Sequence, residues 1–404
     1  MTGRAVIVGA SHAGAQVAAS LRQLKWDGDI VLVGDEAALP YQRPPLSKAY
    51  LAGDVSVDSL AIRGGEFYTK QRITRLRATV ASLDLEMSDL HLSGGELLHF
   101  DRLAICTGAR PRKLDAPGED LPGVFYLRTA ADVESIRAAA RPGRRVVIVG
   151  GGYVGLETAA SLRKLGLDVT VLEATERLLR RVTAPEVSAF YARIHTTAGV
   201  VIRTGETVVA FGGDERVREV VLTGGERIPA DLVIIGIGVV PNVELAAAAG
   251  LAVDDGVIID DRAQTSDPSA VAAGDCATHT MARYGRRIRL ESVPSAGEQA
   301  KVAASTMCGK AKEITALPWF WSDQYDLKLQ IAGLNSGYDD VVINGDPAHG
   351  RDFSCFYLRA GRLIAADCIN RPRDFMFSKQ ALGQGREVDR SELEALASER
   401  LGAA

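Results

Sequence analysis

Residues 5–14 read AVIVGASHAG and residues 146–155 read VVIVGGGYVG, so one pattern occurs twice in the chain. Each copy begins with four apolar residues and enters a glycine-containing turn, and a helical pattern follows at residues 15–24 or 156–165. A strand, a glycine turn and a helix in this order form the first part of a βαβ unit of the kind that binds a dinucleotide.

Each copy continues into a second apolar run, at residues 30–33 and 169–172, which ends near an acid. The acid is Asp35 in the first copy and Glu173 in the second. A carboxylate at this place accepts hydrogen bonds from a ribose diol and repels a 2′-phosphate. Glu173 therefore favours NADH, and the nearby Arg177 leaves NADPH as the alternative.

The glycines of the fingerprint have separate physical functions. The first permits a tight turn, the second lets backbone amides approach a pyrophosphate, and the third lets helix and strand pack closely. The helix N-terminus then presents N–H groups and a partial positive charge to the phosphates. In the first copy Ser11 replaces the second glycine, and its Cβ narrows the approach. The expected contacts are Gly9, Ser11 and Gly14 in the first copy and Gly150, Gly152 and Gly155 in the second.

Composition and charge indicate an ordinary globular protein. The 404 residues predict two to three domains, and 47% are hydrophobic while 24% are charged. A net charge of −4 argues against nucleic acid or an anionic membrane as the main partner. We find no leader pattern and no apolar run of the roughly 18 residues that a membrane span needs. We therefore expect a cytoplasmic enzyme.

The five cysteines are Cys106, Cys276, Cys308, Cys355 and Cys368, and none forms a C-x-x-C pair. An odd number in a large chain without a secretion signal argues against a disulfide framework. The six histidines show no metal-ligand spacing, so we predict no metal site.

Strand-like runs also occur at residues 103–106, 232–235 and 257–259, and residues 110–123 are typical of a domain boundary. Another change comes near Pro318, where the aromatic residues Trp319, Phe320 and Trp321 begin. The runs at residues 353–358 and 363–366 and the helical patterns after them predict a smaller α+β domain at the end of the chain.

The order of motifs resembles a known superfamily, the flavoprotein reductases with two dinucleotide-binding domains. The matching stretches are residues 9–14, 43–48, 107–111, 150–157 and 273–276, although Ser11 and Cys106 depart from the usual glycine and alanine. A finer resemblance, to the oxygenase-coupled NADH-dependent ferredoxin reductases, is carried by residues 182–185, 236–238, 291–294, 318–325 and 370–372.

The resemblance implies an α/β fold of glutathione-reductase type, with two Rossmann-like domains and a C-terminal α+β domain. It implies an FAD-binding domain at residues 1–110 and 241–317, an NADH-binding domain at 111–240 and an interface domain at 318–404. Family members are often monomers or weak dimers, and we expect the same here.

The resemblance also implies cofactor contacts. Asp35 would bind the FAD ribose, and Ala13 would lie beside the pyrophosphate. Lys48 would lie close to the flavin ring and pair with Glu157, and these two are the expected catalytic residues. Ile237 and Gly238 would border the nicotinamide, while further FAD contacts would come from Arg43, Val80, Thr107, Gly108, Arg128, Asp275, Val293 and Trp321. From chemistry alone, a lysine near a flavin stabilises the negative charge of the reduced ring.

The cysteine pattern indicates how electrons leave the flavin. Disulfide reductases of this superfamily carry redox cysteines near the flavin, but residues 40–48 contain none, and Cys106 is expected to be a buried small hydrophobe. Electrons would then leave the flavin directly for an external carrier. The resemblance implies that this carrier is a 2Fe–2S ferredoxin and that Trp321 lies close to the flavin edge, facing it, while at least one of the tryptophans is expected to pack in a domain core. Ferredoxins are commonly acidic, so the candidate docking residues are Lys301, Lys328, Arg371, Arg373 and Lys379.

Two alternatives stay open. The acceptor is another molecule, such as rubredoxin, a quinone, monodehydroascorbate or oxygen, or the chain acts through protein partners as apoptosis-inducing-factor-like flavoproteins do. Among the ferredoxin reductases, the resemblance favours one whose ferredoxin supplies electrons to a cytochrome P-450 monooxygenase over one that supplies a Rieske dioxygenase.

Overall fold

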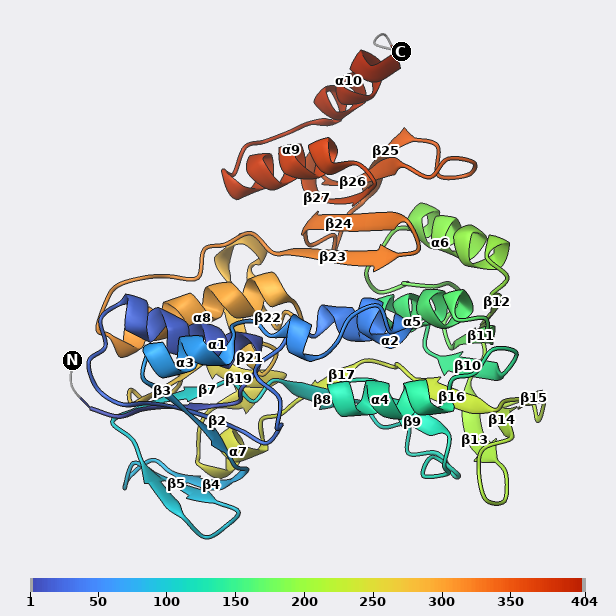
Figure 1. Ribbon diagram of the computed structural model, residues 1–404. Coiled ribbons are helices and arrows are strands. Elements are labelled where there is room, and N and C mark those ends of the chain that lie inside the picture. The colour runs from blue at the N-terminus through green and yellow to red at the C-terminus, as the bar shows by residue number, and fades with distance from the viewer. Residues whose placement is uncertain (1–2, 402–404) are drawn as a thin grey trace. The chain divides into compact units, whose positions relative to one another are not determined.

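The computed structural model describes residues 3–401 and divides into two compact units, many of whose elements are labelled in Figure 1. The first unit comprises residues up to Gln42, Ser56–Arg110 and Val239–Ala316, and the second comprises Arg43–Val55, Pro111–Gly238 and the residues from Leu317 onward. The short segment Arg43–Val55 thus differs from the predicted boundary, because helix α2 (Ala49–Ala52) packs against α5 (Tyr153–Lys164) of the second unit. The three-domain division stays a prediction.

A parallel five-stranded sheet forms the centre of the first unit. Its strand order is β20-β7-β1-β2-β3, and the strand β1 is buried along its whole length because helices cover both faces of such a sheet. Helix α1 (His12–Gln23) packs against α8 (Val293–Met307), and α3 (Gly65–Lys70) contacts β3. The strands are β1 (Ala5–Val8), β2 (Ile30–Gly34), β3 (Ile73–Arg77), β7 (Arg102–Ile105) and β20 (Ala270–Ala272).

Smaller sheets complete the first unit. Three antiparallel strands form a meander that contacts α7 (Glu244–Ala248), namely β4 (Val80–Asp84), β5 (Asp89–Leu92) and β6 (Leu97–His99). A mixed sheet consists of β18 (Val253–Asp254), β19 (Gly256–Ile259), β21 (Ala277–Met281) and β22 (Arg286–Ile288). Strand β8 (Ala109–Pro111) pairs with β17 (Val239–Pro241) where the chain passes between units.

The second unit repeats the parallel architecture. Its sheet has the order β12-β11-β10-β16-β9, with α5, α6 (Pro185–Thr197) and α4 (Ala130–Ala139) as its helices. The strands are β9 (Val124–Tyr126), β10 (Arg145–Val149), β11 (Asp168–Glu173), β12 (Val201–Thr204) and β16 (Leu232–Ile235). A three-stranded antiparallel sheet follows, with β13 (Val208–Gly212), β14 (Glu219–Leu222) and β15 (Arg227–Pro229).

The C-terminal part of the second unit is an antiparallel sheet with the order β23-β24-β27-β26-β25 and the helices α9 (Pro372–Gly383) and α10 (Arg390–Leu401). Its hydrophobic core includes Phe356, Phe375 and Leu382, and Trp319 packs against it. Its strands are β23 (Trp319–Gln324), β24 (Leu327–Gly333), β25 (Asp340–Gly345), β26 (Phe353–Arg359) and β27 (Arg362–Ile369).

The two fingerprint helices begin earlier than the sequence predicts. We expected starts at residues 15 and 156, whereas α1 begins at His12 and α5 at Tyr153. The last residues of each fingerprint therefore form the first helical turn, since Ser11 and Gly152 are the extended residues just before it. This places the helix N-terminus directly at the glycine turn.

Among residues 3–401, no helix has the length and apolar character needed to cross a lipid bilayer.

Candidate functional site

The first and third fingerprint glycines are required by the fold itself. A Cβ on Gly9 would lie 2.0 Å from the carbonyl oxygen of Cys106, and one on Gly150 would lie 2.3 Å from that of Gly236. The φ angle is positive in both turns, 110° at Gly9 and 114° at Gly150, and residues that carry a side chain rarely adopt such angles. A Cβ on Gly14 would meet the Gly9 oxygen at 1.9 Å. These glycines therefore bring helix and strand together.

The second fingerprint position is different. Gly152 has an ordinary φ of −82°, and a Cβ there would meet no atom of the described residues within 4 Å. Ser11, at the same place in the first copy, also has an extended φ, −118°. The fold does not demand glycine here, and the space beside Gly152 is open to a group from outside the chain. A bound pyrophosphate is such a group.

The N-termini of α1 and α5 are also suited to a phosphate. Neither helix has an acid in its first turn, and Gly152 has no side chain that could cap α5. The first N–H groups of a helix need acceptors, and a phosphate supplies them together with the charge that the helix dipole favours. The residues present thus fit two dinucleotides.

Loops at the carboxyl edge of the first sheet meet beside its fingerprint. A Cβ on Gly274 would lie 3.0 Å from the Cβ of Ala13, so the loop that carries Asp275 lies next to the start of α1. Thr107 Oγ1 donates to the carbonyl oxygen of Asn242 at 2.7 Å, and Asn242 Nδ2 donates to the Thr107 oxygen at 2.9 Å. Sequence reasoning missed Asn242, because its partner lies 135 residues away and only the preceding Pro241 hints at a turn.

Other predicted FAD contacts of the first unit lie on its strand and helix ends. Asp35 is exposed just beyond β2, and Gly108 has a left-handed φ of 68°. Val80 opens β4 and Val293 is the first residue of α8. In the second unit, Arg43 Nη1 donates to the carbonyl oxygen of Arg128 at 2.7 Å, so these two predicted residues adjoin each other.

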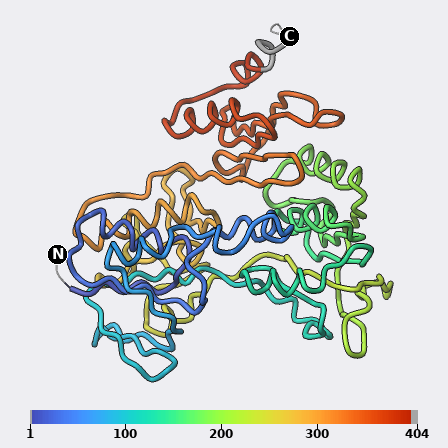
Figure 2. Tube along the Cα trace, in the orientation of Figure 1, coloured from blue at the N-terminus to red at the C-terminus, as the bar shows by residue number. Residues whose placement is uncertain are grey.

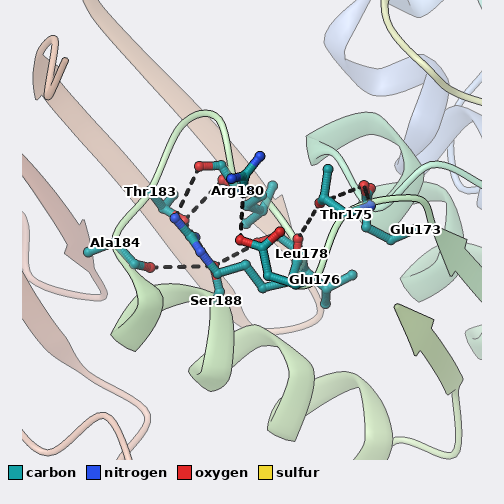
Figure 3. Close-up of polar contacts among 10 residues, drawn as sticks. Glu173, Thr175, Glu176, Leu178, Arg180, Thr183, Ala184 and Ser188 are labelled. Atoms are coloured by element: carbon teal, nitrogen blue, oxygen red, sulfur yellow. Dashed lines mark hydrogen bonds and ion pairs between the residues drawn. The ribbon is translucent and has the colours of Figure 1, made fainter. Parts of the chain in front are cut away.

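Glu173 lies at the end of β11 in a fixed orientation (Figure 3). Its Oε2 accepts from the Gly151 amide at 2.8 Å, and its Oε1 accepts from the amide and the hydroxyl of Thr175, both at 2.8 Å. The carboxylate is therefore held against the glycine turn, where a ribose of a bound dinucleotide would need it.

Two of the arginines that follow Glu173, Arg177 and Arg180, are bonded to other residues of this segment and of α6. Arg177 Nη1 donates to Ser188 Oγ at 2.6 Å, and its Nη2 donates to the carbonyl oxygen of Arg180 at 3.1 Å. Arg180 in turn pairs with Glu176 at 2.6 Å, as Figure 3 shows. Both guanidinium groups thus already have partners, which does not favour a 2′-phosphate site.

The second unit buries an ion pair behind its fingerprint. Glu157 on α5 is 4% exposed, and its Oε2 lies 2.6 Å from Lys48 Nζ. The same oxygen accepts from Ser47 Oγ at 2.5 Å, and Oε1 accepts from Ser322 Oγ at 2.6 Å. Lys48 Nζ also donates to the carbonyl oxygen of Pro44 at 3.0 Å. Lys48 Nζ also donates to Ser47 Oγ at 3.5 Å, so all three N–H groups of the ammonium have partners within the second unit.

Figure 2 follows the two chain segments that meet in this arrangement, residues 43–55 and α5. Ser47 and Ser322 were missed by sequence reasoning, although both stand in motifs that carried the resemblance. A lone serine has no distinctive pattern, and only its spatial partner reveals its function.

The aromatic group on β23 has two faces. Trp319 lies with its ring 5.7 Å from that of Trp321 and 5.9 Å from that of Phe375, so it belongs to the C-terminal core. Phe320 points to the opposite side and contacts Tyr153 at a ring distance of 5.0 Å. Trp321 is half-buried and lies on the same face of the strand as Trp319.

Beyond β16, Gly236 leads to the two residues predicted to border the nicotinamide. Gly238 has a φ of 102° and its oxygen accepts from the Arg112 amide at 2.9 Å, while Ile237 is packed against the core of this part of the second unit. A Cβ on Gly238 would meet Arg181 at 3.8 Å.

Two family models match the chain. The model described as pyridine nucleotide-disulphide oxidoreductase matches residues 3–300, and the one described as reductase C-terminal matches residues 319–399. The chain belongs to the pyridine nucleotide-disulphide oxidoreductase family.

Individual relatives in this family are similar over nearly the whole chain. Putidaredoxin reductase of Pseudomonas putida is 47% identical over 384 residues, covering 93% of this chain and 91% of the relative. The covalent putidaredoxin reductase–putidaredoxin complex contains a chain that matches with a TM-score of 0.95 and 44% identity, covering 100% of this chain and 99% of that one. The ferredoxin reductase for the CYP199A2 system from Rhodopseudomonas palustris matches with a TM-score of 0.93 and 44% identity over 96% of both chains.

These matches confirm the resemblance to the oxygenase-coupled ferredoxin reductases. They also confirm the fold class, the prediction of an oxidoreductase, and FAD and NAD(H) as the cofactors that this family membership implies.

The family is named for disulphides, yet all five cysteines of this member are free thiols. Cys106 is 4% exposed, and burial raises its pKa well above the usual range, so it is packed as a small apolar residue. No group of His, Cys, Asp or Glu within residues 3–401 is arranged to hold a metal ion.

The predicted docking residues differ in their surroundings. Lys301, in the first unit, and Lys328 and Arg373, in the second, are exposed. Arg371 pairs with Asp352 at 2.7 Å, and Lys379 Nζ stands 4.3 Å above the ring of Trp319. The last two are already committed to partners within the chain.

Proposed function

We propose that this chain takes hydride from NADH with FAD as its cofactor and delivers single electrons to a 2Fe–2S ferredoxin. The observation that carries the proposal is the pair of matched glycine turns, each required by close backbone contacts, in a chain similar from end to end to a putidaredoxin reductase. The solved relative in complex with putidaredoxin supports a ferredoxin as the acceptor.

The proposed division of labour follows the predicted domains. Residues 1–110 and 241–317 bind FAD, residues 111–240 bind NADH, and residues 318–404 serve the protein partner. FAD contacts the Gly9–Gly14 turn, Asp35 and the Asp275 loop, while NADH contacts the Gly150–Gly155 turn and Glu173. When bound, FAD supplies the chemistry that joins a two-electron donor to a one-electron acceptor.

Lys48 and Glu157 are the proposed catalytic residues. The ammonium of Lys48 stabilises negative charge that develops nearby, and the bonded carboxylate of Glu157 fixes the position of that ammonium. The role toward the flavin rests on the resemblance. Neither residue needs to gain or lose a proton, because the step that they serve is placement of charge.

We further propose that NADH is preferred over NADPH. The support is the fixed carboxylate of Glu173 at the ribose position and the engagement of Arg177 with Ser188. A carboxylate there repels a 2′-phosphate, and no relocation of Arg177 is needed to bind a free 2′-hydroxyl.

The proposed partner chain is a ferredoxin that supplies a cytochrome P-450 monooxygenase. The exposed cations Lys301, Lys328 and Arg373 are the stronger docking candidates, because their charges face solvent. We also propose a cytoplasmic location and a monomer or weak dimer, with five free thiols as the supporting observation for the former.

The test is direct. The purified protein should show a flavin spectrum that NADH bleaches anaerobically, and NADH-driven cytochrome c reduction should rise strongly on addition of a 2Fe–2S ferredoxin. Parallel assays with rubredoxin, quinone, monodehydroascorbate and oxygen test the other acceptors. A colourless protein, or a flavin that NADH does not bleach, contradicts the proposal. Slow bleaching without turnover on any acceptor favours the apoptosis-inducing-factor-like alternative.

A further inference from the structure

A continuous chain of hydrogen bonds joins the buried carboxylate of Glu157 to the protein surface within the second unit. Ser322 Oγ lies 2.6 Å from Glu157 Oε1, and Gln324 Nε2 lies 3.2 Å from Ser322 Oγ. Gln324 Oε1 then lies 2.8 Å from His195 Nε2, and His195 Nδ1 lies 3.1 Å from the hydroxyl of Tyr325. Tyr325 is 38% exposed, so the chain of hydrogen bonds ends at a partly exposed residue.

The direction of every bond follows from the acceptor at the inner end. An ionised carboxylate only accepts, so Ser322 uses its one hydrogen toward Glu157 and must accept from Gln324. The amide NH2 of Gln324 thus faces Ser322, and its oxygen accepts from His195 Nε2–H. In a neutral imidazole the remaining Nδ1 then accepts from the Tyr325 hydroxyl. All four bonds donate toward Glu157.

The surroundings favour that arrangement. Ser322 and His195 are fully buried and Gln324 is 1% exposed, so each would lose free energy if its polar atoms lacked partners. Burial also lowers the pKa of His195, which keeps the imidazole neutral. Strand alternation on β23 places Ser322 and Gln324 on the one face that contacts α5.

The outer end is held by an unusual backbone conformation. Tyr325, at the turn between β23 and β24, has a φ of 56°, which is uncommon for a residue with a large side chain. Its ring meets that of His195 edge-on at a centroid distance of 5.1 Å. A two-residue connection between antiparallel strands requires this conformation at its first residue, and the turn thereby fixes Tyr325 beside His195.

We infer that His195, Gln324 and Ser322 are positioning residues that hold the Glu157 carboxylate, and through it Lys48, in the orientation that NADH oxidation requires. This inference rests on the proposed function, because it assigns the chain to the pair that serves NADH. The chain orients and does not conduct protons, since the amide of Gln324 neither gains nor loses a proton at ordinary pH.

Matched variants test the inference. His195→Leu removes the N–H that Gln324 accepts, whereas His195→Gln keeps an amide N–H at the same distance along the side chain. We expect the anaerobic rate of flavin reduction by NADH to fall about tenfold in His195→Leu, which is the smaller of the effects usual when a residue that orients a functional side chain is removed. In His195→Gln the rate should stay within about threefold of the wild-type rate. The control is His279→Leu, another buried histidine, which should leave the rate unchanged.

A double-mutant cycle separates positioning from general damage. In a Glu157→Gln background, the His195→Leu substitution should no longer change the reduction rate, because the carboxylate that the chain orients is gone. An equal fall in both backgrounds overturns the inference. If His195→Leu fails to fold, Tyr325→Phe makes the same test at the exposed end, with an expected fall of about twofold to threefold, and an unchanged rate there overturns it.

A readout independent of turnover is the tautomer of His195. Nitrogen NMR of 15N-histidine-labelled holoprotein, assigned by the signal lost in His195→Gln, should show a neutral imidazole with the proton on Nε2 at pH 8. A proton on Nδ1 overturns the inference. If NADH does not bleach the wild type, the proposed function and the inference fail together, whereas equal bleaching rates in the wild type and both His195 variants overturn only the inference.

Discussion

The two fingerprint copies agree at some positions and differ at others, and the division is physical. Gly9 and Gly150 each face a carbonyl oxygen of a neighbouring strand end, at Cys106 and Gly236, with a hypothetical Cβ at 2.0 and 2.3 Å. Ser11 and Gly152, by contrast, differ in residue type, and the fold demands neither. Glycines required by backbone packing are thus the same in both copies, while the position with open space beside it in the second copy has diverged.

The acids also differ in their placement. Val8 pairs with Val33 and Val149 with Leu172, so Asp35 lies two residues beyond its paired residue and Glu173 only one. Glu173 is consequently part of a strand and bonded to the glycine turn, whereas Asp35 is exposed beyond β2. Glu173 of the second copy is thus held by hydrogen bonds within the fold, whereas the Asp35 side chain of the first copy is accessible to solvent or to a cofactor.

Substitution of the first glycine should have the largest effect. We expect Gly9→Ala to yield protein without flavin absorbance, and Gly150→Ala to keep flavin but to lose at least about 100-fold in the NADH reduction rate, since displaced carbonyl contacts cost several kcal/mol. Visible spectra and stopped-flow reduction measure both. Gly143→Ala is the control, because its φ is also positive, 77°, but no described atom lies within 4 Å of its Cβ. A yellow Gly9→Ala protein with normal reduction contradicts the comparison.

Replacing the acid of each copy by alanine should have the next largest effect, and the effect should differ between the two copies. Glu173→Ala leaves the amides of Gly151 and Thr175 without an acceptor, so we expect a loss of about 1–3 kcal/mol in the free energy of unfolding and a fall of about tenfold in the NADH-over-NADPH ratio of kcat/KM. Asp35→Ala should weaken FAD binding without that loss of stability. Urea unfolding and steady-state kinetics are the measurements, and equal destabilisation by both variants would count against the distinction.

Exchange of the second positions should have a smaller effect. Gly152→Ser should leave the unfolding temperature unchanged, because the space is open, but should raise the Kd for NADH about threefold to tenfold by crowding the pyrophosphate. Ser11→Gly should retain FAD at least as tightly and change stability by only a few tenths of a kcal/mol. Calorimetric titration measures the Kd for NADH of each protein. An unaltered Kd in Gly152→Ser would show that this position does not face the ligand.

The smallest effect is expected at Cys106, which stands where the second copy has Gly236. Cys106→Ala should change NADH-to-ferredoxin turnover by less than about twofold, as expected for a conservative change without a chemical role. Because burial raises the thiol pKa, native Cys106 stays protonated at pH 8 and should resist iodoacetamide. Rapid labelling with loss of turnover would instead indicate a sulfur relay.

Local pattern was enough to predict much of the fold. The buried strands of 5–8 and 146–149, the glycine turns and both acids were all visible, because each depends on neighbours a few residues away. Strand 232–235 has the predicted bounds, and several other strands differ by one or a few residues at their ends. The helix starts were displaced by three residues, since the fingerprint itself forms the first helical turn.

The candidate site was harder to predict from the sequence than the fold. Ser322 and Glu157 lie 165 residues apart, and His195 and Gln324 lie 129 apart, so no spacing rule connects them. The contact between Lys48 and Glu157 was expected only through the resemblance, because a lysine after two prolines is by itself a common surface residue. Long-range polar partners of this kind become visible only when a fold has brought them together.

The early segment Arg43–Val55 has a consequence for how the protein is made. Its Ser47 and Lys48 supply two of the three side chains around the Glu157 carboxylate, although more than a hundred residues separate them along the chain. During synthesis on the ribosome, this segment emerges long before α5 and β23, so its contacts with them form only after those elements have been made. A fragment that begins at Pro111 would retain the entire second glycine turn yet leave a buried carboxylate without its cation, so proteolytic or genetic dissection at that point should release an unstable piece.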